Sequence, residues 1–276
     1  MKFSLCNECF ENWTWTDTVQ AIAEAGYDGV EISPFALADS VADLSPAERQ
    51  TIRKQAEDLG LDVVGLHWLF VSPKGLHTTT DDDAVRQRTT TYLQELIRFC
   101  GDVGGKVMVI GSPYQRDVKE GVPYEVAWQR FVDMILASLE LAAERDVILC
   151  MEALPASMTN FCTTLDEAVK MVEQVAALRP NLSPWFQTMF DVHNAILETD
   201  PLPELLRRHL GHVRHVHVNE MDGGHPGSGD YDFEAILDVL RKGGYKGYVS
   251  TEAFDFAPGG VQIAQESLRR LRAALR

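Results

Sequence analysis

The strongest constraint on the fold is an alternation that runs through the whole chain. Short apolar runs of four to six residues are each followed by a longer segment whose apolar residues recur at helical spacing. These runs predict eight strands, at residues 2–6, 29–32, 61–66, 107–110, 147–151, 185–190, 213–218 and 248–251. Eight strand–helix units without a linker or a shift in composition predict one closed (β/α)8 TIM barrel, an α/β fold, over residues 1–276.

Helix start signals support this alternation. Ser45-Pro46, with Glu48 in the following turn, is typical of a helix beginning. An earlier helix is expected to be capped by Thr16 or Asp17. A doubly wound open sheet would also alternate strands and helices, but it favours a G-x-G-x-x-G turn after an early strand, and none stands there. We therefore favour the barrel.

Charge and hydropathy exclude some partners. The chain has 25 Lys and Arg against 41 Asp and Glu, a net charge of −16 without a visible basic cluster, so nucleic acid is not expected as a partner. No apolar run reaches the roughly 18 residues of a membrane span, and the N-terminal run is too short for a signal peptide. The five cysteines are scattered, and Cys6-x-x-Cys9 lacks the second pair of a zinc site. We expect packing thiols in a cytoplasmic protein without a membrane partner.

The residues at or just past the end of the predicted strands are mostly acids and histidines. They are Glu8, Glu31, His67, Gly111, Ser112, Glu152, Asp191, His217 and Glu252. In a barrel the carboxyl ends of the strands meet at one mouth, so these residues should ring one cavity. Any single acid could be solvated or cap the next helix. Glu152 and Glu252, however, follow buried-looking runs, where an unpaired carboxylate is costly.

A divalent cation is the simplest partner for three carboxylates and one imidazole in one pocket. The predicted ligands are Glu152, Asp191, His217 and Glu252. Hard oxygen ligands favour Mn²⁺, Mg²⁺ or Co²⁺, and the histidine also allows Zn²⁺ or Fe²⁺. We expect one such ion, with Mn²⁺ first. A metal held in this way polarises a carbonyl and stabilises an enediolate.

Two stretches, GYDGVEI at residues 26–32 and YVSTEAFDF at residues 248–256, mark the limits of a family resemblance. The chain resembles the sugar phosphate isomerase/epimerase superfamily of xylose isomerase-like TIM barrels. That superfamily includes D-tagatose 3-epimerases, hydroxypyruvate isomerases and inosose dehydratases. The resemblance implies a barrel with one catalytic divalent metal.

The resemblance also assigns roles to individual residues. The family's metal ligands fall on Glu152 in MEALPASMTNFCTT, Asp191 in MFDVHNA, His217 shortly before PGSG, and Glu252 in VSTEAF. By similarity to the epimerases of this family, Glu152 and Glu252 would also be the catalytic acid and base on opposite faces of the substrate. Barrels of this family often associate, so a homo-oligomer is compatible with the resemblance.

Several substrate contacts of the ketose 3-epimerases are absent. These enzymes commonly carry Asn and Glu where this chain has Pro155 and Met158, and Arg where it has Gly223. Their substrate-binding His follows the metal Asp by three residues, whereas His193 follows Asp191 by two. The metal cage is kept, while several substrate contacts of the free-ketose epimerases are missing.

Two further histidines are candidates for substrate binding. His67 precedes Trp68, an arrangement of a polar group beside an aromatic wall, although a core histidine is an equal alternative. His193 lies beside Asp191, where it would contact substrate or orient the aspartate.

Together these features predict a metal-dependent isomerase or epimerase of a small carbohydrate: a ketose, a sugar phosphate or a related polyol. It would remove a proton next to a carbonyl and form an enediolate. The alternative is a lyase or dehydratase of a keto-sugar, keto-inositol or 3-keto-glycoside on the same scaffold. An endonuclease-like hydrolase would require more histidine ligands and a surface that tolerates DNA. A binding protein without catalysis is the fourth hypothesis.

Overall fold

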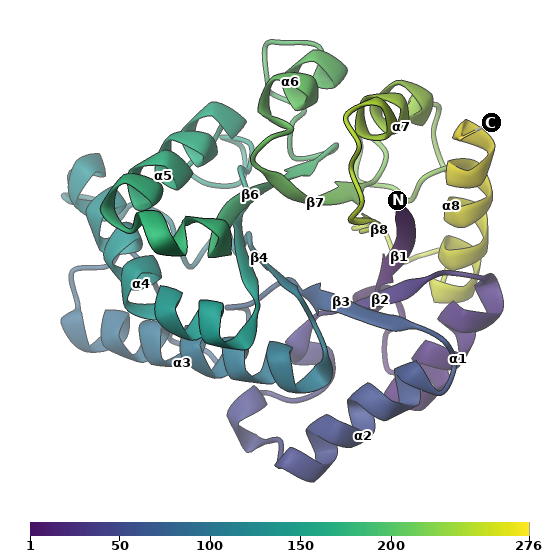
Figure 1. The fold of residues 1–276 in the computed structure, drawn as a ribbon, viewed down its shortest axis with the longest axis horizontal. Helices are drawn as coiled ribbons and strands as arrows, with labels where there is room; N and C mark the ends of the chain where they lie inside the picture. Colours follow the sequence, from purple (N-terminus) through teal and green to yellow (C-terminus); the bar gives the residue numbers. More distant parts are fainter. Residues whose placement is uncertain (276) are drawn as a thin grey trace.

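Eight parallel strands close into a barrel in the computed structural model, which describes residues 1–275 (Figure 1). The strands are β1 (Lys2–Cys6), β2 (Gly29–Ile32), β3 (Asp62–Leu66), β4 (Val107–Ile110), β5 (Ile148–Met151), β6 (Phe186–Asp191), β7 (Val213–Val218) and β8 (Tyr248–Thr251). Each strand pairs with its sequence neighbours, and β1 closes the ring against β8 in the register Lys2 to Tyr248. The predicted barrel is confirmed.

Helices surround the strands (Figure 1). They are α1 (Trp15–Ala25), α2 (Pro46–Glu57), α3 (Asp83–Val103), α4 (Tyr124–Arg145), α5 (Leu165–Leu178), α6 (Leu202–His209), α7 (Phe233–Lys242) and α8 (Gly260–Ala274). Short 3-10 turns η1 (Asn7–Cys9) and η2 (Pro34–Ala36) follow β1 and β2. Within residues 1–275, no helix combines the length and apolar character that crossing a bilayer requires.

Two helix beginnings show how local chemistry sets the boundaries. At α2 the Ser45 hydroxyl accepts a hydrogen bond from the Glu48 amide, and the Glu48 carboxylate accepts one from the Ser45 amide, as predicted. At α1 the prediction was wrong, because Thr14 caps the helix by accepting from the Asp17 amide at 3.2 Å. Thr14 also donates to the Asp17 carboxylate at 2.7 Å, so the acid belongs to the first turn and Thr16 lies within the helix.

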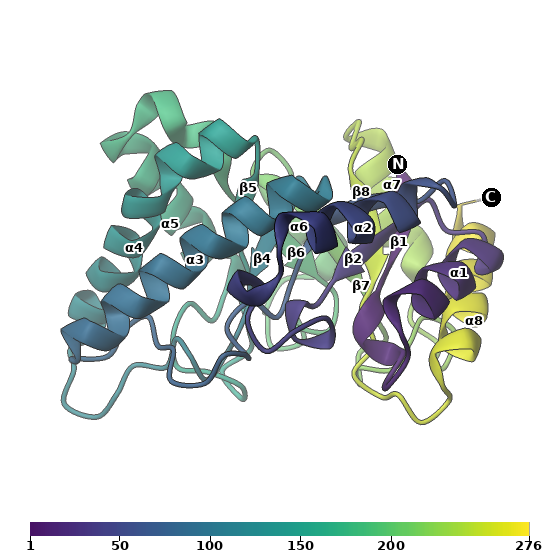
Figure 2. The ribbon, with the colours of Figure 1, turned by 90° about the horizontal axis from the view of Figure 1, so that it is seen from below.

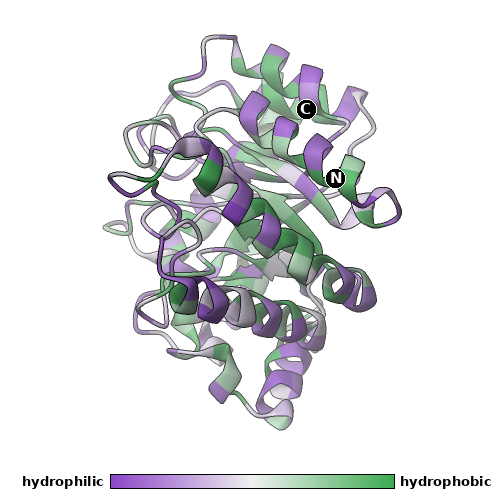
Figure 3. Ribbon diagram, turned by 90° about the vertical axis from the view of Figure 1, so that its left-hand side faces the viewer, coloured by the Kyte–Doolittle hydropathy of each residue, from purple (hydrophilic) through white to green (hydrophobic). Residues whose placement is uncertain are grey.

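Apolar side chains fill two spaces. The larger cluster packs the outer face of the strands against the helices, and Figure 3 shows hydrophobic residues on the strands and hydrophilic ones on the outer helix faces. A smaller cluster contains only strand residues, so it fills the barrel interior; it comprises Val64, Val107, Val109, Cys150 and Met189. The packed interior therefore holds the carboxyl ends of the strands in fixed positions.

The five cysteines are packed in the protein interior, as predicted. All five are free and buried, and the Cys9 thiol donates to the Cys6 carbonyl oxygen at 3.6 Å. Burial raises the pKa of both thiols well above the ordinary value. A high thiol pKa disfavours redox chemistry, which requires the thiolate.

Long connections gather at the end of the barrel where the strands finish (Figure 2). They include residues 67–82 after β3, 111–123 after β4, 152–164 after β5 and 219–232 after β7. The amino ends of the strands are joined to the helices by shorter turns. The loops therefore surround the residues expected to carry the chemistry.

Candidate metal and substrate site

Four side chains from neighbouring strands converge at the mouth. Glu152 follows β5, Asp191 ends β6, His217 lies in β7 and Glu252 follows β8. One nitrogen or oxygen atom from each lies within 4.8 Å of those of the others, and all four residues are buried. The structure thus brings together the four residues that the sequence predicts as metal ligands.

Burial and mutual repulsion govern the charge of this cluster. Burial raises the pKa of Glu152 to about 8, and the neighbouring Glu252 and Asp191 add to the rise. Burial also raises the pKa of Asp191 to about 6. Burial opposes the charge of His217, but Glu31 and Glu252 outweigh it and hold the imidazole pKa well above its ordinary value. Three acids thus face one imidazole, a donor set and charge that fit a divalent cation.

A buried carboxylate behind His217 sets the orientation of its ring. Nε2 donates to the Glu31 carboxylate at 3.0 Å, while Nδ1 lies 2.9 Å from Glu252 and 3.8 Å from Asp191. Glu31 also accepts from His215 Nε2 at 2.7 Å, so its carboxylate bonds inside the barrel. With Nε2 donating to Glu31, the ring turns Nδ1 toward the acids, where it donates to Glu252 in this structure and would offer its lone pair to a bound cation.

Two asparagines that the sequence analysis missed hold the carboxylates in place. Asn194 Nδ2 donates to Glu152 at 2.9 Å, and its backbone amide donates to Asp191 at 2.7 Å. Asn219 Nδ2 donates to the second oxygen of Asp191 at 3.1 Å. Asn219 lies two residues after His217, so strand alternation was a signal that could have found it.

Gly111 marks a close approach at the end of β4. A Cβ atom there would lie 1.6 Å from Glu152 Oε2, so only glycine leaves room for this carboxylate. Arg116, in the next loop, is buried and donates to the Glu152 carbonyl oxygen at 2.6 Å. Both residues fix Glu152 from the β4 side, and the sequence did not indicate either role.

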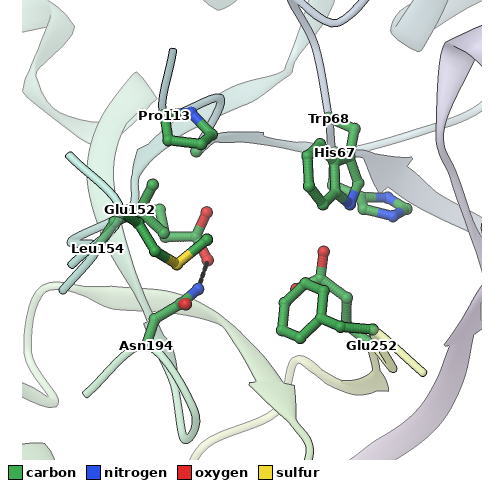
Figure 4. Close-up of a pocket in the computed structure, with 10 residues that line it drawn as sticks. His67, Trp68, Pro113, Glu152, Leu154, Asn194 and Glu252 are labelled. Atoms are coloured by element: carbon green, nitrogen blue, oxygen red, sulfur yellow. Dashed lines mark hydrogen bonds between the residues drawn. The ribbon is translucent and has the colours of Figure 1, made fainter. Parts of the chain in front are cut away.

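A cavity opens beside the cluster (Figure 4). Its walls are formed by His67, Trp68, Gly111, Pro113, Glu152, Leu154, Met158, Asn194, Glu252 and Phe254. Figure 4 shows Glu152, bonded to Asn194, on one side of the cavity, Glu252 across from it, and Trp68 on a third side. A small ligand in this cavity would lie between the two glutamates.

The two candidate substrate histidines occupy different places. His67 lines the cavity and donates from Nε2 to the Glu8 carboxylate at 2.7 Å. Burial opposes its charge, but Glu8 raises the pKa of His67 to about 9. The His193 ring bonds the Met221 carbonyl oxygen through Nδ1 at 2.8 Å, and its centroid lies 5.3 Å from that of Phe254. Its ring therefore lies beside a cavity wall.

The link between His193 and Asp191 is indirect. The His193 backbone amide donates to Asn219 Oδ1 at 2.8 Å, and Asn219 in turn donates to Asp191. In the part of the chain that the structure describes, no hydrogen bond joins the His193 ring to Asp191. The ring therefore does not orient Asp191 directly, and contact of His193 with substrate stays a prediction.

Comparison with known proteins adds three relatives. The chain is 25% identical over 240 residues to the L-ribulose-5-phosphate 3-epimerase UlaE of Escherichia coli strain SMS-3-5, covering 84% of this chain and 80% of that protein. The structure of the 3-keto-D-glucoside 4-epimerase YcjR from E. coli aligns with a TM-score of 0.84, at 21% identity over 99% of both chains. That of D-psicose 3-epimerase from Clostridium cellulolyticum H10 gives 0.85, at 18% identity over 100% of both chains.

The two structural likenesses agree with the closed barrel described above. The family model described as xylose isomerase-like TIM barrel matches residues 19–274, which include all four clustered side chains. This chain belongs to the xylose isomerase-like TIM barrel family.

Proposed function

We propose that this protein is a divalent-metal-dependent isomerase or epimerase that moves a proton at the carbon next to a sugar carbonyl, through an enediolate. The observation that carries the proposal is the position of Glu152 and Glu252 on opposite sides of one cavity, within a cluster that also contains Asp191 and His217 (Figure 4). The names of the three relatives support it, because each is a sugar or sugar phosphate epimerase.

The metal would be held by Glu152, Asp191, His217 and Glu252. A divalent cation, when bound, supplies the positive charge that favours loss of a proton beside a carbonyl. Mn²⁺ is our first expectation, with Mg²⁺, Co²⁺, Zn²⁺ and Fe²⁺ as alternatives. The hydrogen bonds that Asn194 and Asn219 donate to the acids, and the one that His217 donates to Glu31, fit this role because they fix the ligand atoms before any ion arrives.

The two glutamates are suited to carry protons. Glu152 accepts from Asn194 through Oε1, which leaves Oε2 toward Gly111 and the cavity. Glu252 accepts from His217 through Oε2, which leaves Oε1 for the substrate. One oxygen of each carboxylate is thus anchored while the other is available. One glutamate would remove the proton from one face and the other return it to the opposite face, which inverts the carbon.

A specific observation keeps the lyase alternative open. Gly223 stands where ketose epimerases carry an arginine, and it has φ +86° with Phe254 Cδ2 only 3.0 Å from an added Cβ. An arginine does not fit this backbone without strain. Met158, another departure, places an apolar side chain in the cavity wall. These changes favour a substrate other than a free ketose. A substrate that carries a leaving group on the next carbon would lose that group from the same enediolate.

The test is proton exchange in D2O. The Mn²⁺-loaded enzyme is incubated with ketoses, sugar phosphates, keto-inositols and 3-keto-glycosides, and products are followed by NMR and mass spectrometry. We expect deuterium at the carbon next to the carbonyl. A product that differs from the substrate in mass only by the deuterium would identify isomerisation or epimerisation. A product that has lost water or an aglycone would identify the lyase.

Variants and chelation complete the design. Glu152→Gln and Glu252→Gln should lower exchange by about 10²–10⁴-fold, because each removes a proton carrier. Glu144→Gln, at an exposed position on α4, serves as the matched control. Full activity after exhaustive chelation would overturn the proposal, as would full activity of either active-site variant.

A further inference from the structure

The charge of the barrel mouth bears on whether the sugar carries a phosphate group. The segments between each strand and the following helix contain only three basic residues, which follow β3 and β4: Lys74, Arg116 and Lys119. The segments after β5, β6, β7 and β8, which carry or adjoin the four clustered side chains, contain none. They contain acids instead, namely Glu152, Glu198, Asp200, Glu220, Asp222, Asp230, Asp232, Glu252 and Asp255.

None of these three basic residues lines the cavity beside the cluster. The two lysines are exposed to solvent. Arg116 is 1% exposed, and its hydrogen bonds go to the carbonyl oxygens of Ile110 and Glu152. His67 does line the cavity, but its Nε2 is paired with the Glu8 carboxylate at 2.7 Å, so the pair adds no net positive charge. The cavity wall therefore offers no free basic side chain to a phosphate group, which proteins usually bind through arginine or lysine.

Backbone amides after the seventh and eighth strands are the other groups that often hold phosphate in such barrels. After β7, the Glu220 carboxylate accepts from the amides of Gly227 and Tyr231, both at 2.9 Å. At the beginning of α7, the Asp232 carboxylate accepts from the Glu234 amide at 3.0 Å. These amides are thus already bonded to carboxylates of the chain itself.

The beginnings of α5 and α8 are occupied as well. The amide of Leu165, the first residue of α5, donates to Glu198 Oε1 at 2.7 Å. Gly260, the first residue of α8, packs so closely against Phe10 that an added Cβ would lie 2.5 Å from the Phe10 ring. An acid or an aromatic ring therefore stands where an anion would bind at these two helices.

We propose that the substrate is a neutral polyhydroxy carbonyl compound and that the barrel mouth rejects its phosphorylated counterparts by charge. This inference rests on the proposed function, which places the reacting sugar between Glu152 and Glu252 (Figure 4). A divalent ion held by Glu152, Asp191 and Glu252 would balance only two of their three negative charges, so a phosphate beside them meets like charge without a basic partner. Hydroxyl groups instead donate hydrogen bonds to carboxylates, so the same acids favour a neutral sugar.

The test compares the binding of matched pairs that differ only in the phosphate. Calorimetry with the Mn²⁺-loaded protein, dialysed free of excess metal, measures the affinities for D-fructose and D-fructose 6-phosphate, L-ribulose and L-ribulose 5-phosphate, and D-glucose and D-glucose 6-phosphate. We expect the neutral member of each pair to bind about tenfold or more tightly. Met158→Lys, which adds a cation to the cavity wall, should narrow this difference by about tenfold. Leu178→Lys, which adds the same charge at an exposed position at the end of α5, is the control and should leave the difference unchanged.

The outcomes that contradict the inference are distinct from failure of the proposed function. Equal or tighter binding of the phosphorylated member of any pair would overturn it even if proton exchange is observed. A difference that Met158→Lys leaves unchanged, in a variant that circular dichroism shows to be folded, would also overturn it, because charge would then not be the cause. Proton exchange on a sugar phosphate and on no neutral compound would contradict it as well. A preference for the neutral members without proton exchange on any compound would support the selection by charge and refute only the proposed chemistry.

Discussion

A single methyl group at Gly111 is expected to disable the metal site while leaving the barrel folded. The added Cβ would lie 1.6 Å from Glu152 Oε2, and an ordinary contact begins at 3.4 Å, so the carboxylate must retreat by about 1.8 Å. Metal–ligand distances tolerate only about 0.2 Å, so Glu152 cannot remain a ligand. The moving atom is the end of a flexible side chain that faces the cavity, so the loss of stability should stay near the lower end of the roughly 1–3 kcal/mol for overpacking.

Three measurements on Gly111→Ala test this reasoning. Calorimetry should show Mn²⁺ affinity reduced by at least about 10–100-fold, and proton exchange should fall by about 10²-fold because the proton carrier is displaced. Circular dichroism should show a folded protein. Gly211→Ala is the control, because an added Cβ there meets nothing within 4 Å. Wild-type Mn²⁺ affinity in Gly111→Ala would refute the placement of Glu152 as a ligand.

Three further substitutions probe the supports of the site and of the fold. Asn194→Ala removes the donor to Glu152 and should weaken Mn²⁺ binding by about 10–100-fold in calorimetry; unchanged affinity would show that this bond does not position the ligand. Glu31→Gln removes the charge behind His217 and should weaken Mn²⁺ binding to a similar extent, whereas tighter binding would contradict the assigned tautomer. Ser45→Ala breaks the capping box and should lower the free energy of unfolding in urea by about 1 kcal/mol without altering Mn²⁺ affinity.

The barrel and the four-residue cluster could be predicted because both follow from rules of order along the chain. Alternating strands and helices predict the closed sheet, and the rule that strand ends meet at one mouth brings Glu152 and Glu252 together although 100 residues separate them. His215 and His217 share one side of β7 because strand side chains alternate, and both contact Glu31.

The supports of the cluster could not be predicted with the same rules. Hydrogen bonds from Asn194 and Asn219 to acids on other strands depend on barrel register and loop geometry, which the sequence does not specify. In the sequence, Gly111 marks only the end of a predicted strand, and its distance to the Glu152 carboxylate reveals its role. Thr14 was missed as a cap because three candidate capping residues stand close together, and the backbone conformation selects among them.

The central claim is that one cation is held jointly by Glu152, Asp191, His217 and Glu252. The most direct measurement is an anomalous difference map from crystals of the Mn²⁺-loaded protein. We predict one peak within about 2.5 Å of a carboxylate oxygen from each of the three acids and of His217 Nδ1. A fully metal-loaded crystal with no peak among these atoms, or with its ion held elsewhere, would contradict the account.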